Sequence, residues 1–467
     1  MKISFHGGAR NVTGSKHLIT LANDTKILLD CGMFQGMGYQ TDQLNSRFGF
    51  EPEKVSCLLL SHAHIDHSGL IPKLVREGFT GKIYCTPATK DLTEILLYDS
   101  AEIQTYEVES INKRRAARNQ PLYEPLYTSE DVAASMKLFE TIDYDQPFQW
   151  NDDVKIVFTN TGHLIGSAAI HLTIRENGKE TSIAFSGDVG RYRSVLLQPP
   201  AGFPQADYII LESTYGDKQH ELTTNNIEPL LKWIKKTCLE KKGKLIIPAF
   251  SVGRTQEVLY ALNQLDLEKL LPDINYFVDS PLSLKATSVI KKYSEHFNDR
   301  LQSVLKIDED PFDFSKLKYI ESVEESKQLV QYKEPCVIIS ASGTADAGRV
   351  RHHIFNCIGE NNHSILLVGY CGEESVGGQL LQGVKEIELM GDPCNVVAEI
   401  GALKSMSAHG DMDDLCQFLS CQDPEKVKSV FLVHGEYEVQ KKFVQKLERK
   451  GFGQVHIPAL HEVVEIH

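Results

Sequence analysis

Residues 61–69 place three histidines and one aspartate within a short stretch that follows an apolar run. His62 and His64 are two positions apart, so in an extended chain they lie on the same side and can bind one metal ion together. Asp66 and His67 follow where the chain must turn, and they can bind a second ion. Imidazole and carboxylate without thiolate favour zinc over manganese or iron, and two such ions can clamp an attacking and a leaving oxygen. The alternative is a chance cluster of solvated or buried histidines, which this spacing at a strand end disfavours.

Five further apolar runs of the chain end in residues that can do chemistry. Their Val, Ile, Leu and Phe content predicts buried strands. The predicted strands cover residues 27–29, 154–158, 182–185, 208–211 and 429–433. The chemically active side chains that follow them are, in chain order, Asp30, His163, Asp188, Glu212 and His434. We expect these side chains to gather at one edge of a sheet, because loops at the ends of a rigid sheet are where sites are commonly built.

The strand-end residues supply ligands that the histidine cluster lacks. His163 would join His62 and His64 on the first ion, and Asp188 could bridge both ions through its two carboxylate oxygens. A lone histidine is more often a structural residue than a ligand. The place of His163 at a strand end, next to a glycine, favours the ligand role.

The second ion needs one more ligand beyond Asp66 and His67, and His434 is the natural candidate. An open position would remain there for a water molecule. Asp30 could instead accept hydrogen bonds from the loop that carries the histidines and so fix the orientation of the ligands. The sequence thus predicts a site for two metal ions, built from segments that lie far apart in the chain.

The length and composition of the chain narrow its class. It has 467 residues, too many for one ordinary core, which predicts two or three domains. No apolar run is long enough to cross a bilayer, and the first residues lack the apolar core of a signal peptide. Ten cysteines without a CxxC spacing indicate reduced, mostly buried thiols and a cytoplasmic location. The net charge of −14 argues against nucleic-acid binding over the whole surface. The basic segment 113–118 is a candidate for a local basic channel, with a solvated helix face as the alternative.

Between about residues 218 and 397 the pattern changes to helices that alternate with strands, which predicts a separate α/β domain. The expected helices cover residues 227–240 and 254–265, and the expected strands cover 244–247 and 336–339. Residues of the metal-binding type resume after this stretch, at His409 and His434. An inserted domain explains this order, with the first fold completed by the C-terminal segment. The predicted domains are residues 1–215 together with 401–467, and the insert 216–400.

Segment 62–67, together with His163 and Asp188, resembles the signature of the metallo-β-lactamase superfamily. Five other segments resemble its β-CASP branch and follow the same order along the chain: 7–15, 211–216, 248–254, 407–411 and 432–436. The resemblance implies an α/β fold in which a four-layer αββα sandwich carries an inserted α/β β-CASP domain. It also implies two zinc ions per chain, with manganese as an alternative, and hydrolysis of nucleic-acid phosphodiesters. We expect no additional KH or C-terminal domain, so the chain is most similar to the compact bacterial relative of the cleavage-and-polyadenylation endonuclease and to ribonuclease J.

The same resemblance assigns functions to residues outside the histidine cluster. His434 would be a ligand of the second ion, and His409, oriented by Glu212, would protonate the leaving oxygen. Asp188 would bridge the ions and help to orient the attacking water. The expected metal ligands are His62, His64, Asp66, His67, His163, Asp188 and His434. The expected catalytic residues are Asp30, Asp66, Asp188, Glu212 and His409.

The resemblance also bears on the substrate. The histidine at position 434 is similar to RNA-processing members of the branch, whereas DNA-repair members tend to carry an aliphatic residue there. Segments 341–344 and 347–353 resemble the glycine-rich stretch that faces the RNA backbone, and a glycine turn followed by Arg and His suits phosphate. This copy departs from the usual pattern at Thr344 and Ala347. The expected substrate-binding residues are Ser251, Arg254, Ser342, Gly343, Arg349 and His352.

The sequence therefore favours a dizinc ribonuclease that hydrolyses RNA phosphodiester bonds with metal-activated water. It would act in RNA processing or decay, as an endonuclease, a 5′-exonuclease or both. The expected partner is single-stranded RNA, with no membrane and with a homodimer as one option. One alternative is a small-molecule hydrolase of the same fold acting on a thioester or lactam, which the large insert, Glu212 and His409 disfavour. The others are a DNA-directed nuclease and a catalytically inactive RNA-binding scaffold.

Overall fold

The computed structural model describes residues 1–38, 40–220, 227–369, 371–403 and 407–467. The chain divides into two compact units. Unit 1 comprises Met1–Tyr192, Pro199–Gln219 and His409–His467, and unit 2 comprises Arg193–Gln198 and His220–Ala408. Unit 1 is thus assembled from segments on both sides of the main part of unit 2 in the sequence. The residue numbers of the domain boundaries drawn from the sequence stay predictions.

Two seven-stranded sheets form the centre of unit 1. The first has the order β22-β1-β2-β3-β4-β5-β6, with β1 (Lys2–Gly7), β2 (Lys16–Thr20), β3 (Lys26–Leu29), β4 (Cys57–Leu59), β5 (Lys82–Cys85), β6 (Phe139–Thr141) and β22 (Glu462–Glu465). The second has the order β21-β20-β11-β10-β9-β8-β7, with β7 (Phe148–Gln149), β8 (Val154–Asn160), β9 (Ala168–Glu176), β10 (Lys179–Phe185), β11 (Tyr208–Glu212), β20 (Ser429–Val433) and β21 (Val455–His456). The five strands predicted before the site residues are confirmed as β3, β8, β10, β11 and β20.

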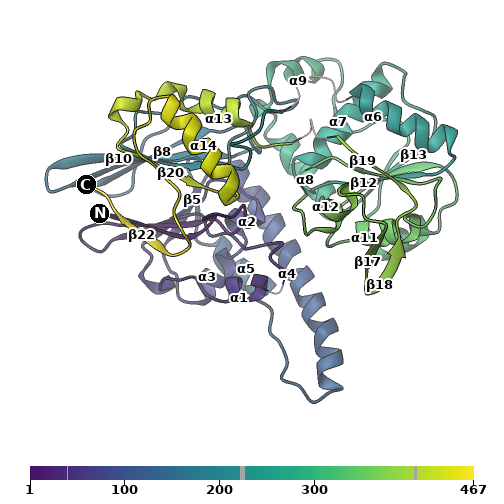
Figure 1. Cartoon of the computed structure of the whole chain (residues 1–467), viewed down its shortest axis with the longest axis horizontal. Helices are drawn as coiled ribbons and strands as arrows, with labels where there is room; N and C mark the ends of the chain where they lie inside the picture. Colours follow the sequence, from purple (N-terminus) through teal and green to yellow (C-terminus); the bar gives the residue numbers. More distant parts are fainter. Residues whose placement is uncertain (39, 221–226, 370, 404–406) are drawn as a thin grey trace. The chain divides into compact units, whose positions relative to one another are not determined.

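Helices cover the outer faces of both sheets of unit 1 (Figure 1). On the side of the first sheet lie α1 (Gln40–Ser46), α2 (Ile65–Ser68), α3 (Ile71–Arg76), α4 (Pro87–Ala116) and α5 (Ser129–Met136). On the side of the second sheet lie α13 (Met412–Phe418) and α14 (Tyr437–Arg449). Short 3₁₀ turns occur at Pro52–Lys54, Leu419–Cys421 and Pro424–Lys426.

Alternating side chains show where the layers of unit 1 meet, because successive residues of a strand point to opposite faces. Ile27 and Leu29 of β3 share a core with Ile210 of β11, so this core lies between the two sheets. Leu28 points the other way, into a core with residues of α3, α4 and α5. Leu211 points into a third core, with residues of α13 and α14. Three cores separate four layers, and the predicted αββα sandwich is confirmed.

Unit 2 is built on a six-stranded parallel sheet of order β14-β13-β15-β12-β16-β19. Its strands are β12 (Lys244–Pro248), β13 (Asn275–Asp279), β14 (Leu317–Tyr319), β15 (Cys336–Ser340), β16 (Ser364–Leu367) and β19 (Glu399–Ala402). Its helices are α6 (Ile227–Ile234), α7 (Arg254–Leu267), α8 (Pro281–Lys292), α9 (Asp299–Val304), α10 (Val323–Val330), α11 (Val350–Cys357) and α12 (Val376–Leu381). A 3₁₀ turn lies at Ser294–His296, and β17 (Glu386–Leu389) and β18 (Asp392–Asn395) form a hairpin. Central strands such as β15 are buried along their whole length, as expected of a parallel sheet covered by helices.

The helix predicted at residues 227–240 is α-helical only to Ile234, and it continues as a π-helix over Lys235–Glu240. Among the residues that the structure describes, no helix is both long and apolar enough to cross a membrane. All ten cysteines carry free thiols, and six of them are buried. Buried, unpaired cysteines of this kind behave as small apolar core residues.

Candidate active site

The predicted site residues of unit 1 follow strands of both of its sheets. In the first sheet, β3 leads to Asp30 and β4 leads to the histidine cluster. In the second sheet, β8, β10, β11 and β20 lead to His163, Asp188, Glu212 and His434. The expectation of a single sheet edge is therefore wrong, because these strands belong to two sheets. The two sheets share one core, and this face-to-face packing brings loops from both of them to one site.

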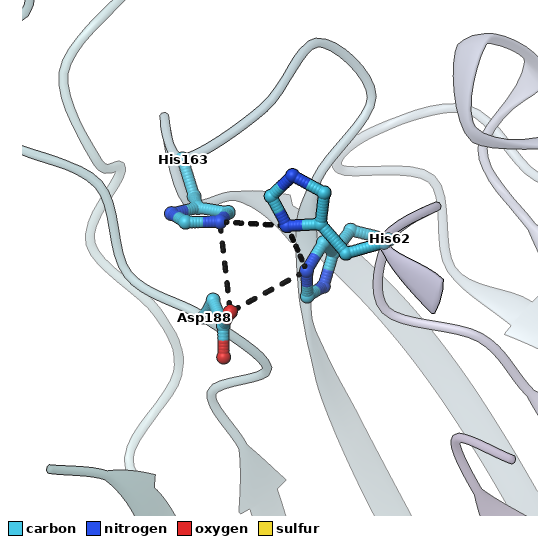
Figure 2. Close-up of side chains that lie close together, drawn as sticks. His62, His163 and Asp188 are labelled. Atoms are coloured by element: carbon cyan, nitrogen blue, oxygen red, sulfur yellow. Dashed lines mark hydrogen bonds and ion pairs between the residues drawn. The ribbon is translucent and has the colours of Figure 1, made fainter. Parts of the chain in front are cut away.

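The first cluster consists of His62, His64, His163 and Asp188, whose ligand atoms converge. Figure 2 shows the side chains of His62, His163 and Asp188 turned toward one another. Nδ1 of His64 lies 3.2 Å from Nε2 of His62 and 3.2 Å from Nε2 of His163. Oδ2 of Asp188 lies 3.4 Å and 3.5 Å from the same two Nε2 atoms. Tetrahedral ligands at zinc distances of about 2.0–2.1 Å are about 3.4 Å apart, so the four atoms fit one such ion.

Burial keeps the imidazoles of the first cluster uncharged. It lowers the pKa of His62 to about 3 and the pKa of His64 to about 4. It also holds the pKa of His163 well below the ordinary value for histidine. Neutral imidazole is the form that binds a metal ion. The first cluster is therefore suited to a metal cation at neutral pH.

Asp66, His67 and His434 form a second cluster beside the first. Oδ2 of Asp66 lies 3.2 Å from Nε2 of His434 and 4.0 Å from Nε2 of His67. Asp188 connects the clusters, because its Oδ1 lies 3.2 Å from Nε2 of His67 while its Oδ2 faces the first cluster. Both His67 Nε2 and Asp188 Oδ1 are buried without a hydrogen-bond partner among the described residues. Such atoms are costly to bury, and a bound cation would supply the missing partner.

Asp30 holds the His67 ring in the orientation that a metal ligand needs. Its buried Oδ2 lies 2.6 Å from Nδ1 of His67, and its carboxylate accepts hydrogen bonds from the backbone N and the hydroxyl of Ser61, both at 2.7 Å. A carboxylate at Nδ1 places the ring proton there. Nε2, which faces Asp188 and Asp66, is then the ring nitrogen left to bind an ion.

Replacing Asp30 with Asn is expected to weaken metal binding about 10–100-fold, because the His67 ring loses the carboxylate that fixes its tautomer. The measurement is a zinc titration of metal-free protein against a competing chromophoric chelator. Asp207→Asn is a matched control, since Asp207 also accepts hydrogen bonds from a serine N and hydroxyl, at 2.8 Å and 3.0 Å from Ser182. Asp207 directly precedes β11, whose other end leads to Glu212 and the site. Equal zinc affinity of Asp30→Asn and wild type would contradict the role of Asp30.

His434 is positioned by contacts that sequence reasoning did not assign. Its backbone N donates to the carbonyl of Gly8 at 2.6 Å, and the N of Gly435 donates to the carbonyl of Asn11 at 3.1 Å. The hydroxyl of Thr214 lies 3.1 Å from Nδ1 of His434, which leaves Nε2 to face the second cluster. The N-terminal glycine motif and the motif after β11 contain these residues, but only the tertiary fold brings them to His434.

Lys16 is a buried cation behind the second cluster, and it too was missed from the sequence. Its Nζ donates to the carbonyls of Gly14 at 2.8 Å and Gly32 at 2.7 Å, and it lies 4.3 Å from the ring centroid of Phe34. Gly32 packs so closely on the backbone of Asp66 that a Cβ there would lie 1.6 Å from the Asp66 carbonyl oxygen. Lys16 thus ties the N-terminal loop to the loop that supports Asp66. Burial lowers the pKa of Lys16 to about 7.

The buried Lys16 predicts a pH-dependent stability. Its pKa of about 7 in the folded protein lies below the ordinary 10.5, so between these pH values the unfolded chain binds more protons than the folded chain. The contribution of Lys16 to the free energy of unfolding therefore rises with pH in this window, by up to about 1.4 kcal/mol per pH unit. Chemical denaturation measures the free energy of unfolding of wild type and Lys16→Met at several pH values in this window. We expect the stability of the wild type relative to Lys16→Met to increase as pH rises. A difference that does not change with pH would contradict the lowered pKa.

His409 and Glu212 form a pair beside both clusters. Nδ1 of His409 lies 3.2 Å from Oε1 of Glu212, and its Nε2 lies 3.9 Å from Oδ2 of Asp188. Backbone N–H groups orient the Glu212 carboxylate, from Val189 at 2.9 Å and Thr214 at 3.1 Å. Burial alone would lower the pKa of His409, but the charges of Glu212 and Asp188 outweigh it and raise the pKa to about 9. These charges therefore favour the form of the ring that carries a proton on each nitrogen.

The predicted substrate-binding residues lie in unit 2, on the segments that follow two neighbouring parallel strands, β12 and β15. Gly343 packs against the ring of Phe250, where a Cβ would approach the ring to 2.7 Å. Ser251 and Arg254 are buried, and the guanidinium of Arg254 pairs with Glu257. The two segments therefore lie side by side, and some of their polar side chains already bind partners within unit 2.

Arg349 is held by partners of its own unit. Its guanidinium donates to Oδ1 of the buried Asp279 at 2.8 Å and to the carbonyl of Glu321 at 2.8 Å. The hydroxyl of Ser342 accepts a hydrogen bond from a backbone N–H of the same loop at 3.3 Å. Of the six predicted residues, His352 is the one whose side chain is exposed. The assignment of all six to substrate binding stays a prediction.

The four-layer fold and its two His/Asp clusters are typical of a metal-dependent hydrolase. Residues 14–246 match the model of the metallo-β-lactamase superfamily, residues 255–380 match the β-CASP domain, and residues 394–458 match the Zn-dependent metallo-hydrolase RNA specificity domain. The chain belongs to the β-CASP branch of the metallo-β-lactamase superfamily. The predicted family is thereby confirmed, and the match together with the clusters supports a metal cofactor.

Three relatives illustrate the similarity. The chain is 32% identical over 438 residues to Ribonuclease TTHA0252 of Thermus thermophilus, and this alignment covers 94% of each chain. It is 27% identical to Transcription termination factor FttA of Methanosarcina mazei, over 93% of this chain and 67% of that one. It is 29% identical to an RNase J-like protein of Methanocaldococcus jannaschii, over 93% of this chain and 92% of that one.

Proposed function

We propose that this chain is a ribonuclease that hydrolyses the phosphodiester bonds of single-stranded RNA with the help of two zinc ions. The observation that carries the proposal is the His409–Glu212 pair, which lies beside two His/Asp clusters joined by Asp188. A hydrolase needs a place to activate water and a proton donor for the leaving group. The clusters offer the first, and His409 offers the second.

The proposed ligands divide between the clusters. His62, His64, His163 and Asp188 would hold one ion, and Asp66, His67, His434 and Asp188 would hold the other. Zinc suits this set because it consists of imidazoles and carboxylates without thiolates. When bound, such ions activate water and neutralise charge on the scissile phosphate. Manganese is the alternative ion.

His409 is the proposed general acid. The carboxylate of Glu212 holds Nδ1 and favours the protonated ring, by raising the pKa of His409. The oxygen of water bonds to phosphorus and releases one proton to solvent, and the bond between phosphorus and the 3′ oxygen breaks. The 3′ oxygen takes a proton from His409 Nε2, and solvent later returns a proton to His409. The products are a 5′-phosphate and a 3′-hydroxyl. Glu212 orients the ring, since its own carboxylate is fixed by two backbone donors.

RNA is the proposed substrate for two reasons. The match to the RNA specificity domain spans residues 394–458, which include both His409 and His434. The relatives include a ribonuclease and an RNase J-like protein that align over most of the chain. In unit 2 the exposed His352 is the proposed point of contact with the RNA backbone. A homodimer and a cytoplasmic location stay predictions.

The test is incubation of purified protein with single-stranded RNA labelled at one end, with and without a chelator. We expect cleavage that the chelator stops and that added zinc restores. Internal fragments would indicate endonuclease action, and a ladder from the 5′ end would indicate exonuclease action. Single-stranded DNA of the same sequence is the matched control. Cleavage of DNA and not of RNA, or cleavage of neither by zinc-loaded protein, would overturn the proposal.

A further inference from the structure

The second half of α4 and the segment that follows it form an arm, defined as residues 102–126. The first part of α4 packs Leu92, Leu97 and Ala101 into the core, but no residue from 102 to 126 is buried. Figure 1 shows this arm extending beyond the layers of unit 1. Burial of apolar surface therefore does not explain why the helix continues past Ala101.

The tip of the arm is nevertheless held in a defined shape. The side-chain amide of Asn112 makes two hydrogen bonds with the backbone of Tyr123, each 2.9 Å long. Nε of Arg115 donates to the carbonyl of Pro121 at 2.6 Å, and its guanidinium lies 4.1 Å from the ring centroid of Tyr123. These contacts attach the returning segment to the helix without an apolar core. Polar groups that fix the shape of an exposed tip point to a surface used for recognition.

The tip is basic in a chain that is acidic as a whole. Between residues 110 and 123 there are four cations and no carboxylate, whereas the chain carries a net charge of −14. Lys113, Arg114 and Arg118 are exposed, and no carboxylate of the described residues pairs with any of them. The acidic residues of the arm, at positions 102, 107, 109 and 124, lie outside the tip. A cluster of four cations at one end of the arm attracts a polyanion.

We propose that the tip of the arm binds the phosphate backbone of RNA outside the metal centre, an inference that rests on the proposed function. Arginine and lysine bind phosphate, and aromatic side chains stack on unpaired bases. Tyr106 is 75% exposed and lies seven residues, or about two turns, before Lys113, so both occupy the same side of the helix. Tyr123, also exposed, lies beneath Arg115. The arm thus adds affinity for RNA long enough to reach both the tip and the site.

The test removes charge from the tip and keeps its shape. The variant Lys113→Gln/Arg114→Gln/Arg118→Gln spares Arg115, which holds the tip together. Lys137→Gln/Lys155→Gln/Lys179→Gln removes three exposed cations elsewhere on unit 1 and is the matched control. Fluorescence anisotropy measures binding of a long single-stranded RNA in a His409→Ala background, so that the RNA stays intact. Cleavage of a pentanucleotide, measured with His409 present, reports on the metal centre alone.

We expect the tip variant to bind long RNA about tenfold more weakly and to lower the slope of log affinity against log salt by about 2, because each phosphate contact contributes about 0.7 for single strands. The control triple should bind like the parent, and cleavage of the pentanucleotide should be unchanged in both. Replacing the same three residues with Glu should weaken binding further than replacing them with Gln. Damage to the fold would not produce RNA affinities that fall in step with the charge of the tip. Circular dichroism checks that each variant keeps its helix content.

The outcomes test RNA binding by the arm separately from ribonuclease activity at the metal site. If the tip variant binds long RNA as tightly as the control, with the same salt slope, the arm does not bind RNA. If it changes the sedimentation of the protein without RNA but leaves RNA affinity intact, the arm is a contact between copies of the chain, and the RNA assignment is overturned. If the wild type cleaves neither RNA, the proposed function fails, whereas weaker RNA binding by the tip variant would still support the arm.

Discussion

Replacing Asp188 with Asn is expected to abolish RNA cleavage and to remove bound metal at the same time. Oδ2 of Asp188 lies 3.4 Å from Nε2 of His62, and Oδ1 lies 3.2 Å from Nε2 of His67, so one carboxylate serves both clusters. The Asn side chain keeps one oxygen but has no negative charge to attract a metal ion. In place of the second oxygen it presents an NH₂ group, which is a hydrogen-bond donor and not a metal ligand. Residues that only orient a ligand are worth about 10–100-fold in metal affinity, so loss of a shared ligand should cost about 100-fold or more.

Metal analysis after gel filtration and cleavage of end-labelled RNA at saturating zinc measure the two effects. We expect about two ions per chain in the wild type and fewer than about one in Asp188→Asn. Asp207→Asn is again the control, since it makes the same chemical change just before β11, at the end of that strand away from the site. If Asp188→Asn kept both ions and its activity, Asp188 would not be a ligand.

Replacing His409 with Ala is expected to lower kcat by about 10²–10⁴-fold while the metal content stays the same, because the variant lacks the proton donor and keeps the ligands. Its Nε2 lies 3.9 Å from Oδ2 of Asp188, close enough to serve a substrate held at the clusters. Removing Glu212 as well should add little, because two residues that act as a unit show strongly non-additive losses. Steady-state kinetics of the single and double variants measure this coupling.

His456 provides a matched control for His409. It forms a similar pair with a glutamate, with its Nε2 at 2.6 Å from Oε1 of Glu462, but this pair is only partly buried and lies on β21 and β22, away from the clusters. His456→Ala should leave kcat and metal content unchanged. His409 also lies within ligand distance of Asp188 and His434. Loss of metal in His409→Ala would therefore show that His409 is a ligand, and the assignment as general acid would be wrong.

Much of the site can be predicted from the local spacing of residues in the sequence. His62 and His64, two apart after a strand, predict two ligands for one ion, and the apolar runs before Asp188 and Glu212 are confirmed as β10 and β11. Such signals survive in a sequence because strand burial and alternation depend on neighbouring residues. The motif order along the chain also predicted the fold, and the family matches agree with it.

Contacts between distant segments could not be predicted in this way. The sequence did not indicate that the site residues come from two facing sheets or that Arg349 is held by the buried Asp279. It did not indicate that Lys16 joins two loops behind Asp66, since a lysine within a strand suggests an exposed residue. The basic segment 113–118 is compatible with an RNA contact and with a solvated helix face, and its sequence does not show that the surrounding tip has a defined shape.

The sequence by itself determined which chemical groups are available: imidazoles and carboxylates at strand ends, in the motif order of one superfamily. The tertiary structure alone decided how these groups work together. It brings Glu212 to His409 across 197 positions, aligns Asp30 with His67, and leaves the tip of the α4 arm exposed. The physical reason is that strand formation follows local patterning, whereas hydrogen-bond partners, burial and pKa depend on which distant segments pack together.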